Sequence, residues 1–143
     1  MIEVQFNEYS ISNDKSKLDT QVILDFLATS YWANKRAPER TLKAIAACDC
    51  YGVYHGDNQV GFARIITDGA TMFYLCDVFI LKEYQGHGLG KKLIETIVGN
   101  EDYEWMLGLL GTLDAHGLYE QYGFEHDPNR FMKRLPQGRA AGS

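Results

Sequence analysis

Three glycines at alternate positions, Gly86, Gly88 and Gly90, lie between an apolar run and an amphipathic run. The apolar run, residues 78–81, has the length and composition of a buried strand, and the apolar residues of 89–97 recur at helical spacing. Glycines where a strand enters a helix let backbone N–H groups approach a ligand closely, and the positive end of the helix dipole attracts an anion. The stretch therefore predicts an anion site, most simply one for phosphate.

The two best-known nucleotide-binding loops do not fit this stretch. A Walker loop needs glycine where Gln85 stands and serine or threonine where Lys92 stands. A dinucleotide fingerprint needs a further glycine at Lys91 or Leu93. The pattern that fits is Q-x-x-G-x-G, which begins at Gln85.

Two titratable residues outside the glycine stretch could move a proton in a reaction. Asp77 interrupts the apolar strand, and a buried charge there is costly without a partner or a task. Three interpretations stay open for it: a general base, a carboxylate that binds an amine, or a structural acid paired with Arg64. Imidazole titrates near neutral pH, so His116 is the second candidate, with a capping or surface role beside Asp114 as its alternative.

The three cysteines, Cys48, Cys50 and Cys76, form no metal or redox motif. The spacing C-x-C at the first two is not C-x-x-C, and no second pair completes a zinc site. We therefore expect the three cysteines to have packing roles and the protein to bind no metal. We also expect it to reside in the cytoplasm, where thiols stay reduced. A covalent route through Cys76 is disfavoured, because strand cysteines usually serve packing.

The composition is that of an ordinary folded protein and narrows the choice of partners. Apolar residues make up 45% and charged residues 23% of the 143 residues, and the net charge is −5. We expect no nucleic acid, because the chain lacks a basic patch, and no membrane, because it lacks an apolar run of about 18 residues. The acidic balance is compatible with a cationic substrate such as an amine. A single domain is expected over residues 1–136, and residues 137–143 have the small, polar composition of a flexible or vector-encoded tail.

The spacing of apolar and turn residues predicts the elements that position these groups. Strands are expected at 2–6, 51–55, 59–67, 71–81 and 103–113, with 8–14 as a polar turn and Phe124 and 131–135 closing the sheet. Helices are expected at 19–31, from Pro38 onward, at 88–98 and, capped by Asp114, at 114–122. Three consecutive strands joined by tight turns make an antiparallel meander. Tyr31 and Trp32, between the first two helices, are expected either to form a lid over a substrate pocket or to pack in the core.

A second motif lies about thirty residues after the glycines, at 118–124, where the sequence LYEQYGF fits L-Y-x-x-x-G-F. With the Q-x-x-G-x-G pattern and the order of elements, it resembles the GNAT superfamily of acetyl-CoA-dependent N-acetyltransferases. The motifs cover the C-terminal half of the chain, and the N-terminal half matches in its order of elements. The resemblance implies an α+β fold, with a twisted, mostly antiparallel sheet of roughly six to seven strands flanked by about four helices.

The resemblance also implies how acetyl-CoA, as the acetyl donor, would be held. Strand residues would offer backbone groups to the pantetheine arm and the acetyl carbonyl, and the loop and helix start would wrap the pyrophosphate. The strand residues are Val78, Phe79 and Ile80, and the loop residues are Gln85, Gly86, His87, Gly88, Leu89, Gly90 and Lys91. Thr112 stands where the family often has an asparagine that contacts the pantetheine. Tyr119 stands where many members place the tyrosine that protonates the departing thiolate.

The activity that the resemblance implies is direct transfer of acetyl from acetyl-CoA to a primary amine of a small molecule or peptide, through a ternary complex. The oligomeric state stays open, and a homodimer is one of the alternatives because homodimers are frequent in the superfamily. The alternative is a non-catalytic acyl-CoA-binding module, against which Tyr119 argues because a mere binder does not need it. A third interpretation is an acyltransferase that uses another acyl group.

Overall fold

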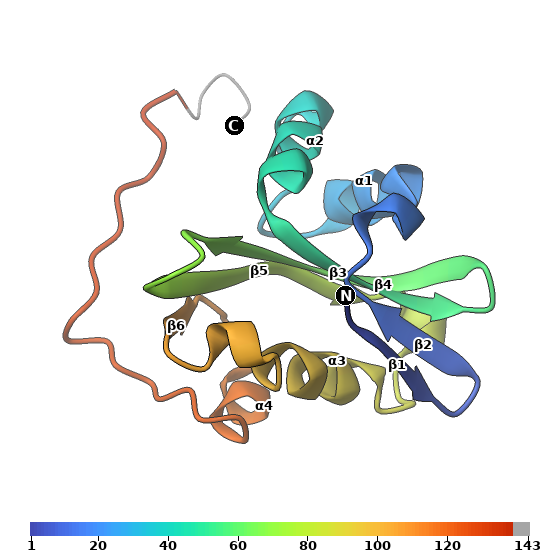
Figure 1. Ribbon diagram of the computed structural model, residues 1–143. Coiled ribbons are helices and arrows are strands. Elements are labelled where there is room, and N and C mark those ends of the chain that lie inside the picture. Colours follow the sequence, from blue (N-terminus) through green and yellow to red (C-terminus); the bar gives the residue numbers. More distant parts are fainter. Residues whose placement is uncertain (139–143) are drawn as a thin grey trace.

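Six strands form one sheet in which the spatial order follows the sequence order, from β1 to β6. A computed structural model of the chain describes residues 1–138 (Figure 1). The strands are β1 (Glu3–Phe6), β2 (Tyr9–Ser12), β3 (Asp49–His55), β4 (Asn58–Thr67), β5 (Met72–Ile80) and β6 (Leu107–Leu110). Neighbours from β1 to β5 pair antiparallel, and β6 runs parallel to β5. The predicted meander, now β3 to β5, is confirmed.

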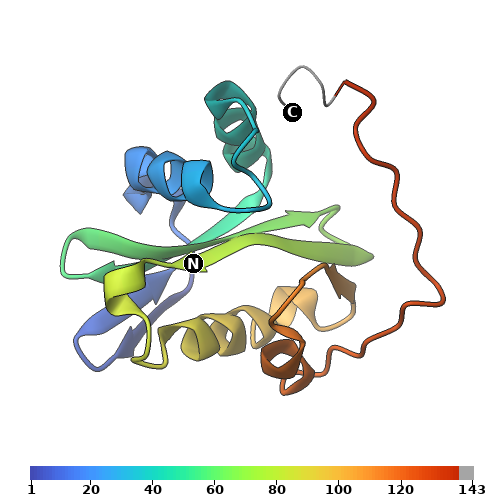
Figure 2. The same cartoon turned by 180° about the vertical axis from the view of Figure 1, so that it is seen from behind.

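Two helices cover each face of this sheet (Figures 1 and 2). On one face lie α1 (Thr20–Thr29) and α2 (Pro38–Ala47), and on the other lie α3 (Leu89–Val98) and α4 (His116–Glu120). Single 3-10 turns occupy η1 (Lys15–Lys17), η2 (Lys82–Tyr84) and η3 (Glu101–Tyr103). The fold is therefore α+β with a mostly antiparallel sheet, as expected. Within residues 1–138, none of the helices combines the length and apolar character needed to cross a membrane.

Local sequence explains where the helices begin. The carboxylate of Asp19 accepts the backbone N–H groups of Gln21 and Val22, which caps α1. Pro38 occupies the first turn of α2, where its missing N–H costs no hydrogen bond. Gly88 precedes α3 in the left-handed region, with a φ of 78° that favours glycine.

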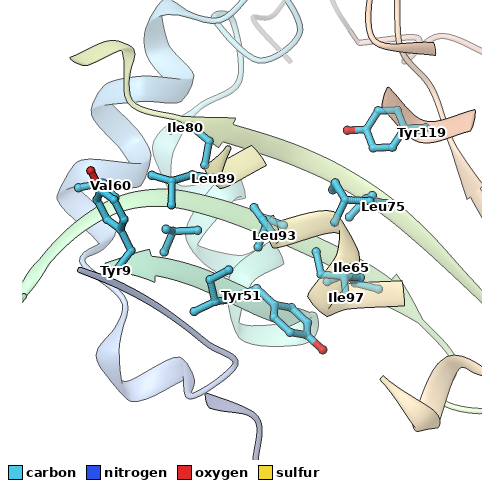
Figure 3. Packing of buried hydrophobic residues seen from close by; sticks show 14 of the residues in the cluster. Tyr9, Tyr51, Val60, Ile65, Leu75, Ile80, Leu89, Leu93, Ile97 and Tyr119 are labelled. Carbon is cyan, nitrogen blue, oxygen red and sulfur yellow. The ribbon is translucent and has the colours of Figure 1, made fainter. Parts of the chain in front are cut away.

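The core lies on both faces of the sheet. The apolar stripe of α3 packs on the sheet, where its residues alternate with the inward side chains of β3, β4 and β5 (Figure 3). The buried residues of that stripe are Leu89, Leu93, Ile94 and Ile97. Each such side chain contributes about 1.5–3 kcal/mol by leaving water, so α3 is held firmly against β5. This contact fixes the start of α3 beside the end of β5.

The sheet opens between β5 and β6. These strands pair only from Met72 opposite Leu107 to Leu75 opposite Leu110. Beyond Leu75, β5 continues to Ile80 with no strand beside it on that edge among the described residues. The backbone groups on this edge are therefore available to a ligand.

A bulge lies in the open part of β5. Phe79 pairs with Phe62 and Cys76 pairs with Arg64, so two residues of β5, at 77 and 78, oppose the single Ala63 of β4. Asp77 has a φ of 52°, a left-handed conformation that costs a non-glycine residue about 1 kcal/mol or more. The bulge therefore stores strain that side-chain contacts of Asp77 must offset.

Two predicted elements near the ends of the sheet are wrong. Residues 8–14, expected as a polar turn, contain the strand β2, because Tyr9 and Ile11 are buried at strand spacing between polar neighbours. The segments at Phe124 and 131–135 do not close the sheet, which ends at β6 within residues 1–138. Prolines at 128 and 136 flank the segment at 131–135, and its apolar side chains stay largely exposed.

The elements between α3 and the C-terminus are shorter than predicted. The expected strand at 103–113 is reduced to β6, which follows the turn η3. The helix expected at 114–122 covers only α4, and Asp114 does not cap it. The hydroxyl of Thr112 instead accepts the N–H groups of Asp114 and Ala115, at 3.4 and 3.1 Å. The expected tail at 137–143 lies mostly outside the described residues.

Candidate active site

A cavity of about 1160 Å³ lies where β5 separates from β6. It collects most of the predicted site residues, which come from the loop before α2, from β5, from the glycine loop, from the loop after β6 and from α4. The predicted residues that line it are Tyr31, Trp32, Asp77, Val78, Phe79, Ile80, Gln85, Gly86, Gly88, Leu89, Gly90, Thr112 and Tyr119. His87, Lys91 and His116 are absent from its lining.

The glycine loop forms one end of the cavity. Gly86 and Gly88 have φ values of 86° and 78°, which only glycine adopts without strain. Gly90 has no positive φ, and a Cβ there would meet Ile80 Cγ1 at 3.9 Å, an ordinary contact. The protein itself therefore does not require glycine at position 90, whereas a ligand lying against the helix start would.

Within the described part of the chain, residues 1–138, three backbone donors at this end have no hydrogen-bond partner. The N–H of Lys92 bonds to the carbonyl of Gly88 at 3.0 Å, so the N–H groups at 89, 90 and 91 precede the first bond of the α3 ladder. These donors and the helix dipole suit an anion, and the first turn of α3 contains no acidic residue. The Gln85 side chain donates to the carbonyl of Ile80 at 3.0 Å and ties the loop to the end of β5.

Tyr119 enters the cavity from α4. Its ring is 9% exposed and packs edge-on against Phe124, with ring centres 5.9 Å apart. Burial is the main cause that raises the pKa of Tyr119, helped by Tyr31 and Asp114, so the phenol stays protonated at neutral pH. Its hydroxyl points from α4 toward the body of the molecule (Figure 3). Among residues 1–138 no group hydrogen-bonds to that hydroxyl, which leaves it available as a proton donor.

Asp77 is held by donors from the neighbouring strand β4 and from the loop before α2. One carboxylate oxygen, Oδ1, accepts Trp32 Nε1 at 2.9 Å and Arg36 Nη2 at 3.2 Å. The other, Oδ2, accepts Arg36 Nη1 at 2.8 Å and Arg64 Nε at 2.9 Å. Burial alone would raise the pKa of Asp77, but the hydrogen bonds and charges of the two arginines outweigh it and hold the pKa below its usual value. Both oxygens are thus occupied by hydrogen bonds. The observed ion pair with Arg64 is the one expected if Asp77 is a structural acid.

Two other candidates have surroundings that bear on their chemistry. Burial raises the pKa of Cys76 to about 12, so the thiol beside the cavity is a poor nucleophile near neutral pH. His116 faces a second hollow, of about 1080 Å³, between β6 and α4, where its ring centre is 4.6 Å from that of His126. The structure therefore does not bring His116 to the β5 cavity.

His87, in the glycine loop, is exposed, with its ring centre 6.5 Å from that of Tyr9.

Some lining residues were missed by sequence reasoning. Arg36, Phe26 and Lys133 line the cavity, but their segments carry no motif. The contact between Arg36 and Asp77 joins residues 41 apart in sequence, and no local spacing encodes such a contact. Among residues 1–138, no three His, Cys, Asp or Glu side chains are grouped to hold a metal ion.

The glycine loop, the separation of β5 from β6 and the motif around Tyr119 can now be set beside known proteins. The family model described as "Acetyltransferase (GNAT) domain" matches residues 46–126. The chain belongs to the GNAT acetyltransferase family. The expected family and fold are thereby confirmed.

Individual relatives agree with this assignment. A solved structure from Xanthomonas campestris pv. campestris, described as a proposed acetyltransferase of the GNAT family, is 36% identical, with a TM-score of 0.86 over 94% of this chain and 97% of that chain. A proposed acetyltransferase of Gibberella zeae is 29% identical over 110 residues, which cover 63% of this chain and 62% of the relative. The chloroplastic GCN5-related N-acetyltransferase 2 of Arabidopsis thaliana is 35% identical over 77 residues, or 48% of this chain and 28% of the relative. The chain thus spans less than two thirds of the length of these two curated relatives.

Proposed function

We propose that the chain transfers the acetyl group of acetyl-CoA directly to a primary amine of a small molecule or peptide. The observation that carries this proposal is the opening of the sheet at Leu75, which joins the glycine loop, the free edge of β5 and Tyr119 in one cavity. Membership of the GNAT acetyltransferase family supports acetyl transfer in general. The donor, the amine acceptor and the ternary complex are parts of the proposal.

The donor fits the cavity in two places. The N–H groups at the start of α3 would bind the pyrophosphate, with room for close approach at Gly90. The free edge of β5 from 76 to 80 would bind the pantetheine amides as an added strand does. The thioester would then lie near the bulge, where the N–H of Phe79 or Ile80 is proposed as the oxyanion donor.

Tyr119 is proposed as the acid of the reaction. The neutral amine attacks the thioester carbonyl and forms the C–N bond, and the tetrahedral intermediate then collapses with cleavage of the C–S bond. The departing thiolate takes the phenolic proton of Tyr119, and the proton that the nitrogen loses as the amide forms returns to the phenolate, so that Tyr119 ends the cycle protonated. A thiolate with a pKa of about 8.5, by analogy with cysteine, benefits from such a donor, and positioned acid catalysis contributes about 10²–10⁴-fold. The buried, protonated phenol suits this role. No enzyme thiol is needed, in keeping with the raised pKa of Cys76.

The amine must arrive without its extra proton. An amine like that of lysine has a pKa near 10.4, so only about one molecule in a thousand is neutral at pH 7. Asp77 is a poor base, because both of its oxygens already accept two hydrogen bonds. We propose that the amine loses its proton to water and enters the cavity neutral.

The test is a titration of the chain with CoA by calorimetry, followed by a screen of amines in which released CoA and acetylated product are both measured. We expect binding of CoA and product from at least one amine. Absence of heat with CoA overturns the proposal. Binding with acetyl transfer to no amine supports the acyl-CoA-binding module instead.

A further inference from the structure

We infer that the acceptor is a primary amine that also carries a carboxylate, which Arg36 and Arg64 bind. This inference rests on the proposed acetyl transfer and names the class of acceptor. It starts from the end of the cavity away from the glycine loop. There Arg64 pairs in register with Cys76, whereas the glycine loop follows the opposite end of β5, after Ile80.

The charges at this end do not balance. Arg36 and Arg64 bring two positive charges to one carboxylate, that of Asp77, and all three line the cavity. The side chains of Arg36 and Arg64 are only 23% and 10% exposed, so water screens the excess charge weakly. Elsewhere in the lining, Lys133 and Asp114 add one charge of each sign, so the excess positive charge is that of the two arginines over Asp77. A buried net positive charge is unfavourable until an anion compensates it.

Each arginine also keeps a donor for such an anion. Among residues 1–138, Arg36 Nε and Arg64 Nη2 form no hydrogen bond, and Arg64 Nη1 has only the sulfur of Cys48, at 3.5 Å. Guanidinium groups bind carboxylates through paired, charge-assisted hydrogen bonds. Two partly free guanidiniums beside the reaction cavity therefore suit a carboxylate on the acceptor.

The remaining wall of this end is aromatic. Phe26 stacks on Phe79 with ring centres 4.1 Å apart, and Trp32 lies tilted beside Phe26 at 6.4 Å. Tyr31 packs edge-on against Trp32, and these two side chains remain 56% and 40% exposed at the cavity. These rings would cover an apolar part of the acceptor, as in an aromatic or branched amino acid.

The same contacts argue against a plain diamine. The net charge of the whole chain, −5, attracts cations in general, but the acid nearest the bulge is already saturated by Trp32 and the arginines. Beside Asp77 a second ammonium group would therefore meet two guanidiniums and a carboxylate that already accepts four hydrogen bonds. The other acid in the described lining, Asp114, lies on the loop before α4.

The experiment compares acceptors that differ only in the carboxylate: phenylalanine with phenethylamine, and leucine with isoamylamine, with putrescine as the diamine. Each rate of CoA release is divided by the concentration of unprotonated amine at the assay pH, so that differences in pKa between the amines do not affect the comparison. We expect the carboxylate to raise kcat/KM by about 10- to 100-fold, the range for a hydrogen bond to a charged group. We also expect 3-phenylpropionate, which lacks the amine, to compete with phenylalanine.

Variants test whether the arginines are responsible. Arg36→Gln should lower the preference for the carboxylate about tenfold while acetyl-CoA affinity stays unchanged, since a guanidinium hydrogen bond is lost. Arg40→Gln, which removes a charge from the exposed first turn of α2, should leave the preference intact. The wild-type comparison of acceptors needs no variant, so it decides the inference even if Arg36→Gln unfolds.

Faster turnover of phenethylamine or putrescine than of phenylalanine would overturn the inference and leave acetyl transfer standing. Binding of acetyl-CoA with no turnover of any carboxylate acceptor would also overturn it. Failure to bind acetyl-CoA would overturn the proposed function itself, and the inference with it.

Discussion

The two ends of the cavity are built in different ways. The end at the glycine loop consists of backbone: the N–H groups before the α3 ladder and the free edge of β5. The end at Asp77 consists of side chains from the loop before α2, from β4 and from β5. A backbone site can serve one invariant ligand through many sequences, whereas a side-chain site changes its ligand with each substitution. The first end suits a common acetyl donor and the second a particular acceptor.

The largest effect is expected where both ends meet, at Tyr119. Tyr119→Phe removes the proton donor and should lower kcat by about 10²–10⁴-fold without changing acetyl-CoA affinity. Steady-state kinetics with calorimetry measures both quantities. Tyr122→Phe is the matched control, because its hydroxyl bonds to the carbonyl of Lys91 at 3.3 Å, away from the cavity lining. If Tyr119→Phe turned over as fast as Tyr122→Phe and the parent chain, Tyr119 would be removed as the acid.

A substitution at the side-chain end should act on stability. Asp77→Asn leaves two buried guanidiniums without their anion and should lower the free energy of unfolding by about 3–5 kcal/mol. The pKa of Asp77 is lowered in the folded chain, so its stabilising contribution is complete above the unfolded pKa of about 3.9 and is lost as pH falls through the folded value.

Denaturant unfolding at several pH values checks this. The parent chain should lose stability below about pH 4, and Asp77→Asn should show a smaller loss over the same interval. The same acid dependence in both chains would show that the ion pair does not support the fold.

A substitution at the backbone end should weaken binding without destabilising the fold. Gly90→Asp meets no backbone strain and an open site, and an acid in the first turn of α3 stabilises the helix by about 0.3–1 kcal/mol. Its carboxylate would repel the pyrophosphate, so CoA affinity should fall about 100-fold, or 2.7 kcal/mol. Calorimetry and thermal unfolding measure the two opposite changes.

Gly117→Asp is the matched control. It places the same new acid in α4, at a position that lines neither hollow and where a Cβ meets nothing within 4 Å. Loss of CoA affinity in both variants would point to a general charge effect, and loss in neither would exclude the glycine loop as the phosphate site.

The contrast between the two ends also explains what could be predicted from the sequence. Gly86 and Gly88 have positive φ values, a conformation that favours glycine, so the residue types alone indicate the role of the backbone there. The residue type at Arg36 does not indicate its role, because that role depends on a fold that brings Arg36 to Asp77, 41 residues away in the sequence. The strand β2 was missed because it has only four residues and two of them are serines, which are common in turns. The closing strand at 131–135 was predicted from its apolar residues, but among residues 1–138 no strand pairs with them.

The smallest expected effect concerns the proton of the amine. If water accepts it, kcat/KM should rise about tenfold per pH unit below the pKa of the amine, and the profile should shift with that pKa between acceptors. Asp77 is already ionised, and each of its oxygens accepts two hydrogen bonds. It should therefore cause no change of slope between pH 6 and 9 when kcat/KM is calculated from the total amine concentration. The profile of Asp77→Asn should therefore keep the parent slope at lower overall activity. A flattened slope in that variant would restore Asp77 as the base, and the side-chain end would then take part in the chemistry as well as in recognition.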